Sequence, residues 1–142
     1  MAKRKKHILS LEPEFDFDMV GICSHHSDYR LAWNINDKLG LRLCKCDDYV
    51  TTDRKGEIKS SHSMYEFEDT INRLNYFMIK NKCQGQFLIH EKPTIDFFLF
   101  LCDNSAIEIE ELLTNLKAVS SILAAYDFIP EEIASAENLA FD

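Results

Sequence analysis

Two acidic residues near the middle of the chain have the surroundings that chemistry requires. Asp96 interrupts the most apolar stretch of the sequence, Ile95 to Cys102, and Glu91 precedes it by one turn. A carboxylate among apolar side chains must be paired or have a shifted pKa. A Glu91/Asp96 pair would bind a cation or perform acid–base chemistry. The alternative interpretation is structural: Asp96 lies at a strand end, where backbone donors cap it or where it pairs with Arg30 or Arg42.

A second set of side chains has the residue types that bind zinc. Its members flank two expected strands and are Cys23, His25, His26, Cys44 and Cys46. Thiolates and imidazoles are the usual zinc ligands, but common structural sites place two to four residues between paired cysteines. Only one residue separates Cys44 from Cys46. Ordinary packing of small thiols is therefore favoured over a metal site.

The residues around His25 and His26 lie where a helix is expected to begin. Free backbone N–H groups at a helix N-terminus attract anions. One hypothesis is therefore a small anionic ligand, and the other is a capped helix start with solvated histidines. In the adjacent group Asp28-Tyr29-Arg30, Arg30 either clamps a ligand carboxylate or forms a surface ion pair.

Composition limits the classes of partner. The chain has 142 residues and a hydrophobic fraction of 46%, which suits one domain with one core. Four of its 16 basic residues lie in Lys3–Lys6, so the other 12 face all 24 acidic residues, a net charge of −12. Because nucleic-acid binding depends on neutralising phosphate, it is not expected of the folded part.

Cysteine count and motifs bear on compartment and activity. Five cysteines, with no apolar segment of signal-peptide type, indicate reduced thiols in the cytoplasm. No stretch has the length of a membrane span. Nucleophile elbows, phosphate-binding glycine loops and dinucleotide fingerprints are absent from the sequence. We therefore expect no cofactor and favour a non-catalytic protein.

Periodicity predicts the secondary structure. Helices are expected at 27–39, closed by Gly40, and at 105–120, opened by a capping box of Ser105 and Glu108. A loop is expected at 47–62. Strands are expected at 7–11, 15–23, 41–46, 63–68, 74–80, 86–89, 94–102 and 122–129.

The order of these elements predicts an α+β fold. Segments 63–68 and 74–80 read as one hairpin, and 86–89 and 94–102 as another. The run Phe97–Leu101 is apolar on both faces and belongs in the centre of the sheet. We expect a mixed, mainly antiparallel sheet with two helices on one face, ferredoxin-like (split βαβ) with an inserted hairpin. A basic tail at 1–6 and an acidic tail at 131–142, with Leu139 and Phe141 as candidate anchors, would flank the domain at 7–130.

The segment Ile89-His90-Glu91-Lys92-Pro93-Thr94-Ile95-Asp96-Phe97 resembles the motif of the IPExxxVDY family of small bacterial proteins. Ile89, Glu91 and Asp96 match that motif, Ile95 and Phe97 replace its valine and tyrosine, and His90 stands in place of its proline. Weaker likeness covers Asp28–Ala32, 39–43, 119–130 and 138–141. The resemblance implies a small bacterial cytoplasmic protein without an established activity. It also implies an association with RNA processing or fatty-acid synthesis, and it marks six residues for binding: Glu91, Asp96, Phe97, Asp28, Tyr29 and Arg30.

Our leading expectation for function is a binding or interaction module that pairs with itself or with another cytoplasmic protein. The support is a surplus of aromatic residues beyond what one thin core needs. They are Trp33, Tyr65, Phe67, Tyr76, Phe77, Phe97, Phe98 and Phe100. The alternatives are an enzyme or ligand-binding protein that uses Glu91/Asp96 or the Cys/His set, and an accessory factor to RNA processing or fatty-acid synthesis.

Overall fold

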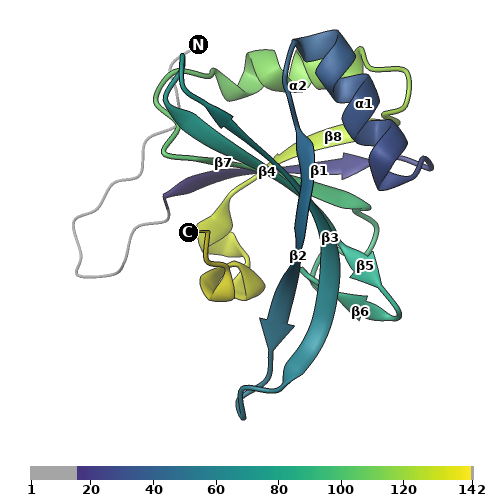
Figure 1. Cartoon of the computed structure of the whole chain (residues 1–142), viewed down its shortest axis with the longest axis vertical. Helices are drawn as coiled ribbons and strands as arrows, with labels where there is room; N and C mark the ends of the chain where they lie inside the picture. The colour runs from purple at the N-terminus through teal and green to yellow at the C-terminus, as the bar shows by residue number, and fades with distance from the viewer. Residues whose placement is uncertain (1–15, 142) are drawn as a thin grey trace.

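A computed structural model describes residues 16–141. The expected strand at 7–11 and the basic tail at 1–6 lie outside this range. Figure 1 shows the α-helices beside a twisted sheet. The elements are β1 (Phe17–Cys23), α1 (Asp28–Leu39), β2 (Cys44–Thr52), β3 (Ile58–Asp69), β4 (Leu74–Lys80), β5 (Lys82–Cys83), β6 (Gln86–Phe87), β7 (Phe97–Cys102), α2 (Ile109–Lys117), β8 (Ala124–Phe128) and the 3₁₀ helices η1 (Pro130–Glu132) and η2 (Ala134–Asn138).

The main sheet has six strands in the order β2-β3-β4-β7-β1-β8, and neighbouring strands are antiparallel. β7 lies between β4 and β1, and all six of its residues are buried. The predicted α+β class, the antiparallel sheet and the central position of the Phe97 strand are confirmed. Neither helix in the described range is long and apolar enough to span a bilayer.

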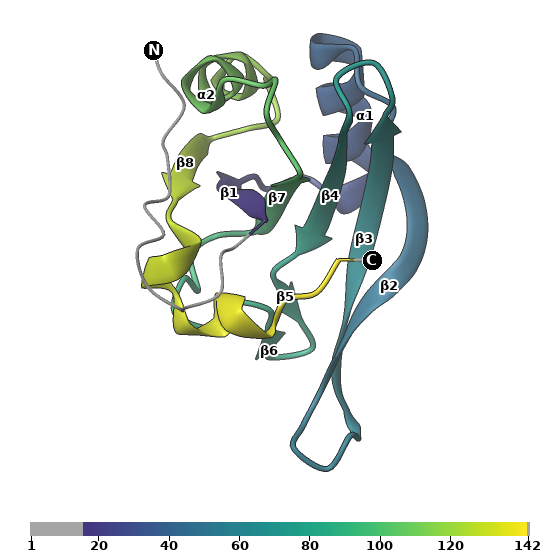
Figure 2. The same ribbon diagram turned by 90° about the vertical axis from the view of Figure 1, so that its left-hand side faces the viewer.

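Apolar side chains form a core on each face of the sheet. Both helices pack on one face, where Leu31, Ile35 and Leu112 join Val20 and Leu99. The opposite face is covered by the segment after β8, as Figure 2 shows. The sheet can therefore be buried on both sides, which explains why β7 lacks an apolar/polar alternation.

Phe141 closes the second core. Its ring centroid lies 4.8 Å from that of Phe100, 5.0 Å from Phe77 and 5.5 Å from Phe17. Leu139 packs against the same core. The described part of the expected acidic tail thus belongs to the packed body, which extends beyond the expected boundary at 130.

Helix α1 begins and ends as its sequence predicts. The Ser27 hydroxyl accepts a hydrogen bond from the Arg30 N–H, and Gly40 follows the helix with φ +71°. A left-handed residue after the last turn favours glycine because it lacks a Cβ. Leu31, Ala32 and Ile35 face the first core, so the predicted helix at 27–39 is confirmed.

The aromatic surplus is mostly accounted for by the two cores. Of the eight aromatic residues named above, six are buried and Phe67 is half-buried, whereas Trp33 is 59% exposed. A sheet covered on both faces needs two layers of large side chains. The expectation of an interface assumed a single thin core, and that assumption is wrong because the sheet has a core on each face.

The loop predicted at 47–62 is wrong. β2 continues to Thr52, and β3 starts at Ile58, so only a short turn separates them. In that turn Gly56 has φ +81°, and the Asp53 carboxylate accepts hydrogen bonds from the backbone of Lys55 and Glu57. Figure 1 shows the hairpin projecting past the other strands. Much of the β2–β3 hairpin is exposed and its side chains are mostly polar, so the sequence shows no apolar alternation that would indicate strands.

The second predicted hairpin, 86–89 with 94–102, is also wrong. Gln86–Phe87 pairs with Lys82–Cys83 across a turn in which Gln84 and Gly85 both have positive φ. β7 instead pairs with β4 and β1. The sequence signal for the Gln84-Gly85 turn was present, but two strands of two residues are too short to show a period.

Helix α2 is shorter than predicted. The range 105–120 shrinks to Ile109–Lys117, and Glu108 at its N-cap makes no capping hydrogen bond with its side chain. The predicted capping box fails because Asn104 organises the preceding turn. Its side chain accepts from the backbone N–H groups of Ala106 and Ile107 and donates to Asp18. The last strand likewise shrinks from 122–129 to Ala124–Phe128.

Candidate functional site

A cavity at one end of the central strands brings together four of the predicted residues, His25, His26, Asp96 and Phe97. We call it the basic hollow, and its volume is about 590 Å³. It is lined by Ser24, His25, His26, Lys80, Lys82, Gln84, Gly85, Pro93, Ile95, Asp96 and Phe97. Three separate chain segments therefore build it, namely the end of β1, the end of β4 with the β5–β6 hairpin, and the residues before β7.

The sheet register brings these segments together. Phe97, the first residue of β7, lies opposite Lys80 of β4 on one side and Ile22 of β1 on the other. The ladder continues one residue further, since the Asp96 N–H donates to the Ile22 carbonyl and the Asp96 carbonyl accepts from the Asn81 N–H. Residues that follow β1 and β4 must therefore flank the start of β7.

Asp96 has a structural partner within the hollow. Its Oδ2 accepts a hydrogen bond of 2.9 Å from the backbone N–H of Ser24. The side chain is only half-buried, because Asp96 precedes β7 instead of lying inside it. This arrangement matches the backbone-capped alternative, and Asp96 also lines the cavity.

Lysine and histidine make the hollow basic. Lys80, Lys82, His25 and His26 line it, with Asp96 as its acidic group. No ion pair within residues 16–141 involves either lysine, although Lys82 Nζ lies 5.7 Å from the centre of the Phe87 ring. Sequence reasoning identified the histidines and missed both lysines, which lie on β4 and β5.

Asn81 holds the wall of the hollow in place. This fully buried side chain donates to the carbonyls of Lys92 and Ile95 and accepts from the Ile89 N–H, at 3.0, 2.9 and 2.9 Å. Its backbone bonds Leu88 and Asp96. The irregular segment from 88 to 96, which carries the family-like motif, is thus tied to the end of β4 by one residue.

A hydrogen-bonded chain of two hydroxyls and one histidine leads to the Lys80 carbonyl. Thr51 contacts Ser60 at 2.5 Å, Ser60 contacts His62 Nε2 at 2.8 Å, and His62 Nδ1 is 2.9 Å from the Lys80 carbonyl. Since a carbonyl only accepts, Nδ1 carries the proton and Nε2 accepts from Ser60. Burial lowers the pKa of His62, partly opposed by the Lys80 carbonyl. His62 is fully buried, so this serine–histidine pair positions β4 and is closed to a substrate.

Glu91 does not share a partner with Asp96. Its two oxygens accept from the backbone and the hydroxyl of Ser135, at 2.9 and 2.6 Å. Burial disfavours the charged form, but these hydrogen bonds outweigh it and lower the pKa of Glu91. No interaction within residues 16–141 joins the two carboxylates, and Glu91 ties the motif segment to η2.

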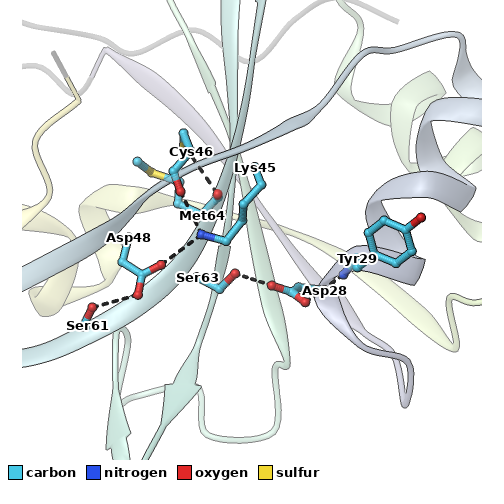
Figure 3. A network of polar contacts seen from close by, with 8 residues as sticks. All are labelled: Asp28, Tyr29, Lys45, Cys46, Asp48, Ser61, Ser63 and Met64. Carbon is cyan, nitrogen blue, oxygen red and sulfur yellow. Dashed lines mark hydrogen bonds and ion pairs between the residues drawn. The ribbon is translucent and has the colours of Figure 1, made fainter.

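Asp28, Tyr29 and Arg30 lie at the start of α1. Figure 3 shows the Asp28 carboxylate between the Ser63 hydroxyl of β3 and the Tyr29 N–H, an arrangement that fastens the helix to the sheet. The Tyr29 side chain is 70% exposed and Arg30 is also exposed. These three residues do not line the hollow.

Beside Asp28, the same figure shows a surface ion pair on β2. Lys45 Nζ lies 3.0 Å from Asp48, whose other oxygen accepts from Ser61. Lys45 and Ser61 together lower the pKa of Asp48. The pair is exposed to solvent, so its contribution to stability is small.

The Cys/His set does not come together. Cys44 and Cys46 lie on the edge strand β2, and three strands separate them from Cys23 on β1. Between residues 16 and 141, no three His, Cys, Asp or Glu side chains are arranged to hold a metal ion. Burial raises the pKa of the Cys23 and Cys46 thiols, which makes them poor metal ligands and nucleophiles.

Comparisons with known proteins add no assignment. No model of a known protein family matches the chain, and no curated protein sequence is significantly similar to it. The resemblance to the IPExxxVDY motif therefore stays a prediction drawn from the residues themselves.

Proposed function

We propose that this protein is a non-catalytic binding module of the bacterial cytoplasm and that the basic hollow holds a small anionic ligand. The observation that carries the proposal is the convergence of Lys80, Lys82, His25 and His26 on one cavity. The chain as a whole has a net charge of −8. A concentration of basic side chains on an acidic protein creates a local field that attracts anions.

The chemistry of the wall narrows the ligand class. Lysine ammonium groups suit phosphate or carboxylate oxygens. Asp96 would accept a hydrogen bond from a ligand hydroxyl, and Pro93, Ile95 and Phe97 offer apolar contact. A small phosphate ester with hydroxyl groups satisfies all three requirements. Among the described residues that line the hollow, no nucleophile is hydrogen-bonded to a side-chain base, which favours binding over catalysis.

Titration with inorganic phosphate and with glycerol phosphate tests the site. We expect glycerol phosphate to bind more tightly, with amide chemical-shift changes confined to residues around the hollow. The double variant Lys80→Gln/Lys82→Gln should weaken binding by at least about tenfold, because two charge-assisted contacts are lost. The matched control, Lys59→Gln/Lys117→Gln, removes the same charge from exposed positions outside the hollow. Equal losses in both double variants would contradict a specific site.

We further propose that the fold is ferredoxin-like with an inserted hairpin. The support is the order β8-β1-β7-β4 within the sheet. If the hairpin β2–β3 is treated as an insertion, α1 connects β1 to β4 and α2 connects β7 to β8. In each case one strand lies between the two connected strands. The hairpin β2–β3 extends the sheet beyond β4. Domains of this type commonly associate through their sheets, so the sheet is also the surface to test for self-association.

Self-association is a second candidate function, and the observation that favours it is the edge strand β8. In the described sheet β8 has no outer neighbour, and Leu123 and Tyr126 are 62% and 49% exposed. Antiparallel pairing of β8 with a second copy would be two-fold symmetric. We expect Tyr126→Lys to shift a dimer to monomer in sedimentation experiments, whereas Ile58→Lys, at another exposed apolar position, should not. A wild-type protein that sediments as a monomer at all micromolar concentrations would exclude this function.

A further inference from the structure

We propose that a second cavity, at the opposite end of the sheet, binds an extended peptide segment of a partner protein that carries aliphatic and basic side chains. This groove has a volume of about 900 Å³. It lies between the end of α1, the turn that joins β3 to β4, and the start of α2. The inference does not depend on the basic hollow, since the two cavities share no lining residue.

The floor of the groove is apolar and incompletely covered. Leu39, Leu41, Phe67 and Ile107 pack against the first core but remain partly exposed. Phe67 stacks on buried Tyr76 with ring centroids 5.7 Å apart. Partly exposed apolar side chains around a depression are the type of surface that binds a partner's aliphatic residues.

One apolar side chain stands out from the rim. Ile71, in the turn after β3, is 89% exposed and lines the groove. The Asp69 carboxylate accepts from the backbone of Ile71 and Asn72 and from the Asn72 side chain, at 3.1, 3.0 and 2.9 Å. Arg73 has φ +60°. The backbone of the turn is therefore fixed before any partner arrives, which limits the backbone entropy lost when a partner contacts Ile71.

The charges of the rim select the occupant. Four acidic residues line the groove, Glu68 and Asp69 from β3, Glu108 at the N-cap of α2 and Glu111 in its first turn, against the two basic residues Lys38 and Arg42. Glu68 and Glu111 have no salt-bridge partner within residues 16–141. Charge complementarity thus favours lysine or arginine next to aliphatic residues, whereas an acidic segment would be repelled.

The binding test uses two labelled hexapeptides and the full-length chain. One alternates lysine with leucine, and the other alternates glutamate with leucine. We expect fluorescence anisotropy to show saturable binding of the first only. Glu68→Gln/Glu111→Gln should weaken that binding by about tenfold, and Ile71→Ser by about fivefold. Glu57→Gln/Glu110→Gln removes the same charge from exposed residues outside the groove and should leave the affinity unchanged.

Several outcomes would overturn the proposal. Equal binding of both peptides, or an equal loss in the control double variant, would show that the groove does not select basic segments. A dimer that Ile71→Ser dissociates would make a second copy the occupant. If the lysine peptide binds only after Lys3, Arg4, Lys5 and Lys6 are replaced by serine, the chain's own basic run competes for the groove and the partner peptide is not its resident.

Discussion

Replacing Asn81 with leucine should cost about 3–5 kcal/mol of unfolding free energy. Leucine fills a similar volume but leaves the carbonyl of Ile95 and the N–H of Ile89 without their partner, and the Lys92 carbonyl keeps only its bond from the Ile95 N–H. Each buried polar group left unpaired costs roughly 1–3 kcal/mol. Two such penalties and the lost bond to Lys92 set the expected range, and shifts of the segment at 88–96 keep the total below the upper limit.

Urea unfolding monitored by circular dichroism measures this loss, which corresponds to a fall in Tm on the order of 10–15 °C for a chain of this length. Asn75→Leu is the matched control, because this half-buried asparagine on β4 makes no side-chain hydrogen bond within residues 16–141. Its effect should stay within about 0.5 kcal/mol. If Asn81→Leu cost no more than this control, the motif segment would have to be held by other contacts.

His62 should make the protein lose stability in mild acid. Burial lowers its pKa in the folded state below the ordinary value of 6.5, so the unfolded chain binds more protons when the pH falls below 6.5. Unfolding free energy therefore rises with pH in this window. The contribution of His62 is complete above pH 6.5, and it is lost progressively as the pH falls toward the lower folded pKa.

His62→Gln removes the titrating group and should flatten this part of the pH profile. At pH 7 it should also cost about 1–3 kcal/mol, because the chain from Thr51 through Ser60 to the Lys80 carbonyl is interrupted. Unfolding in urea at several pH values between 5 and 8 measures both effects. The exposed His25→Gln control should leave the unfolding free energy at pH 7 within about 0.5 kcal/mol of wild type. A slope that survives in His62→Gln would assign the acid sensitivity to other groups.

The elements with a clear period were predictable from the sequence. Helix α1 has a serine cap, an apolar stripe and a closing glycine, and each signal is local. The central strand β7 was predictable because six consecutive apolar residues, all buried, can only lie between covered layers. Leu139 and Phe141 were also identified as anchors, since they are apolar residues within an acidic segment.

The hairpin β2–β3 and the wall of the hollow were not predictable, because their signals are not local. Strand β3 is stabilised by pairing with β2 and β4. Polar residues can occupy such a strand where one of its faces is exposed to solvent. Asn81 reads as a turn residue in the sequence, and its role follows only from the position of the segment it bonds. Lys80 and Lys82 join the histidines through strand order, which residue spacing does not encode.

Strand β1 has a consequence for how the chain acquires its shape. It is the first described strand, yet its two neighbours, β7 and β8, are among the last, so Phe17 must find Cys102 and Cys23 must find Ala124. Loops of this length close at an entropic cost before any contact rewards them. An apolar ribbon with both edges open would thus persist while most of the polypeptide is synthesised, and chaperone demand should be highest during that interval.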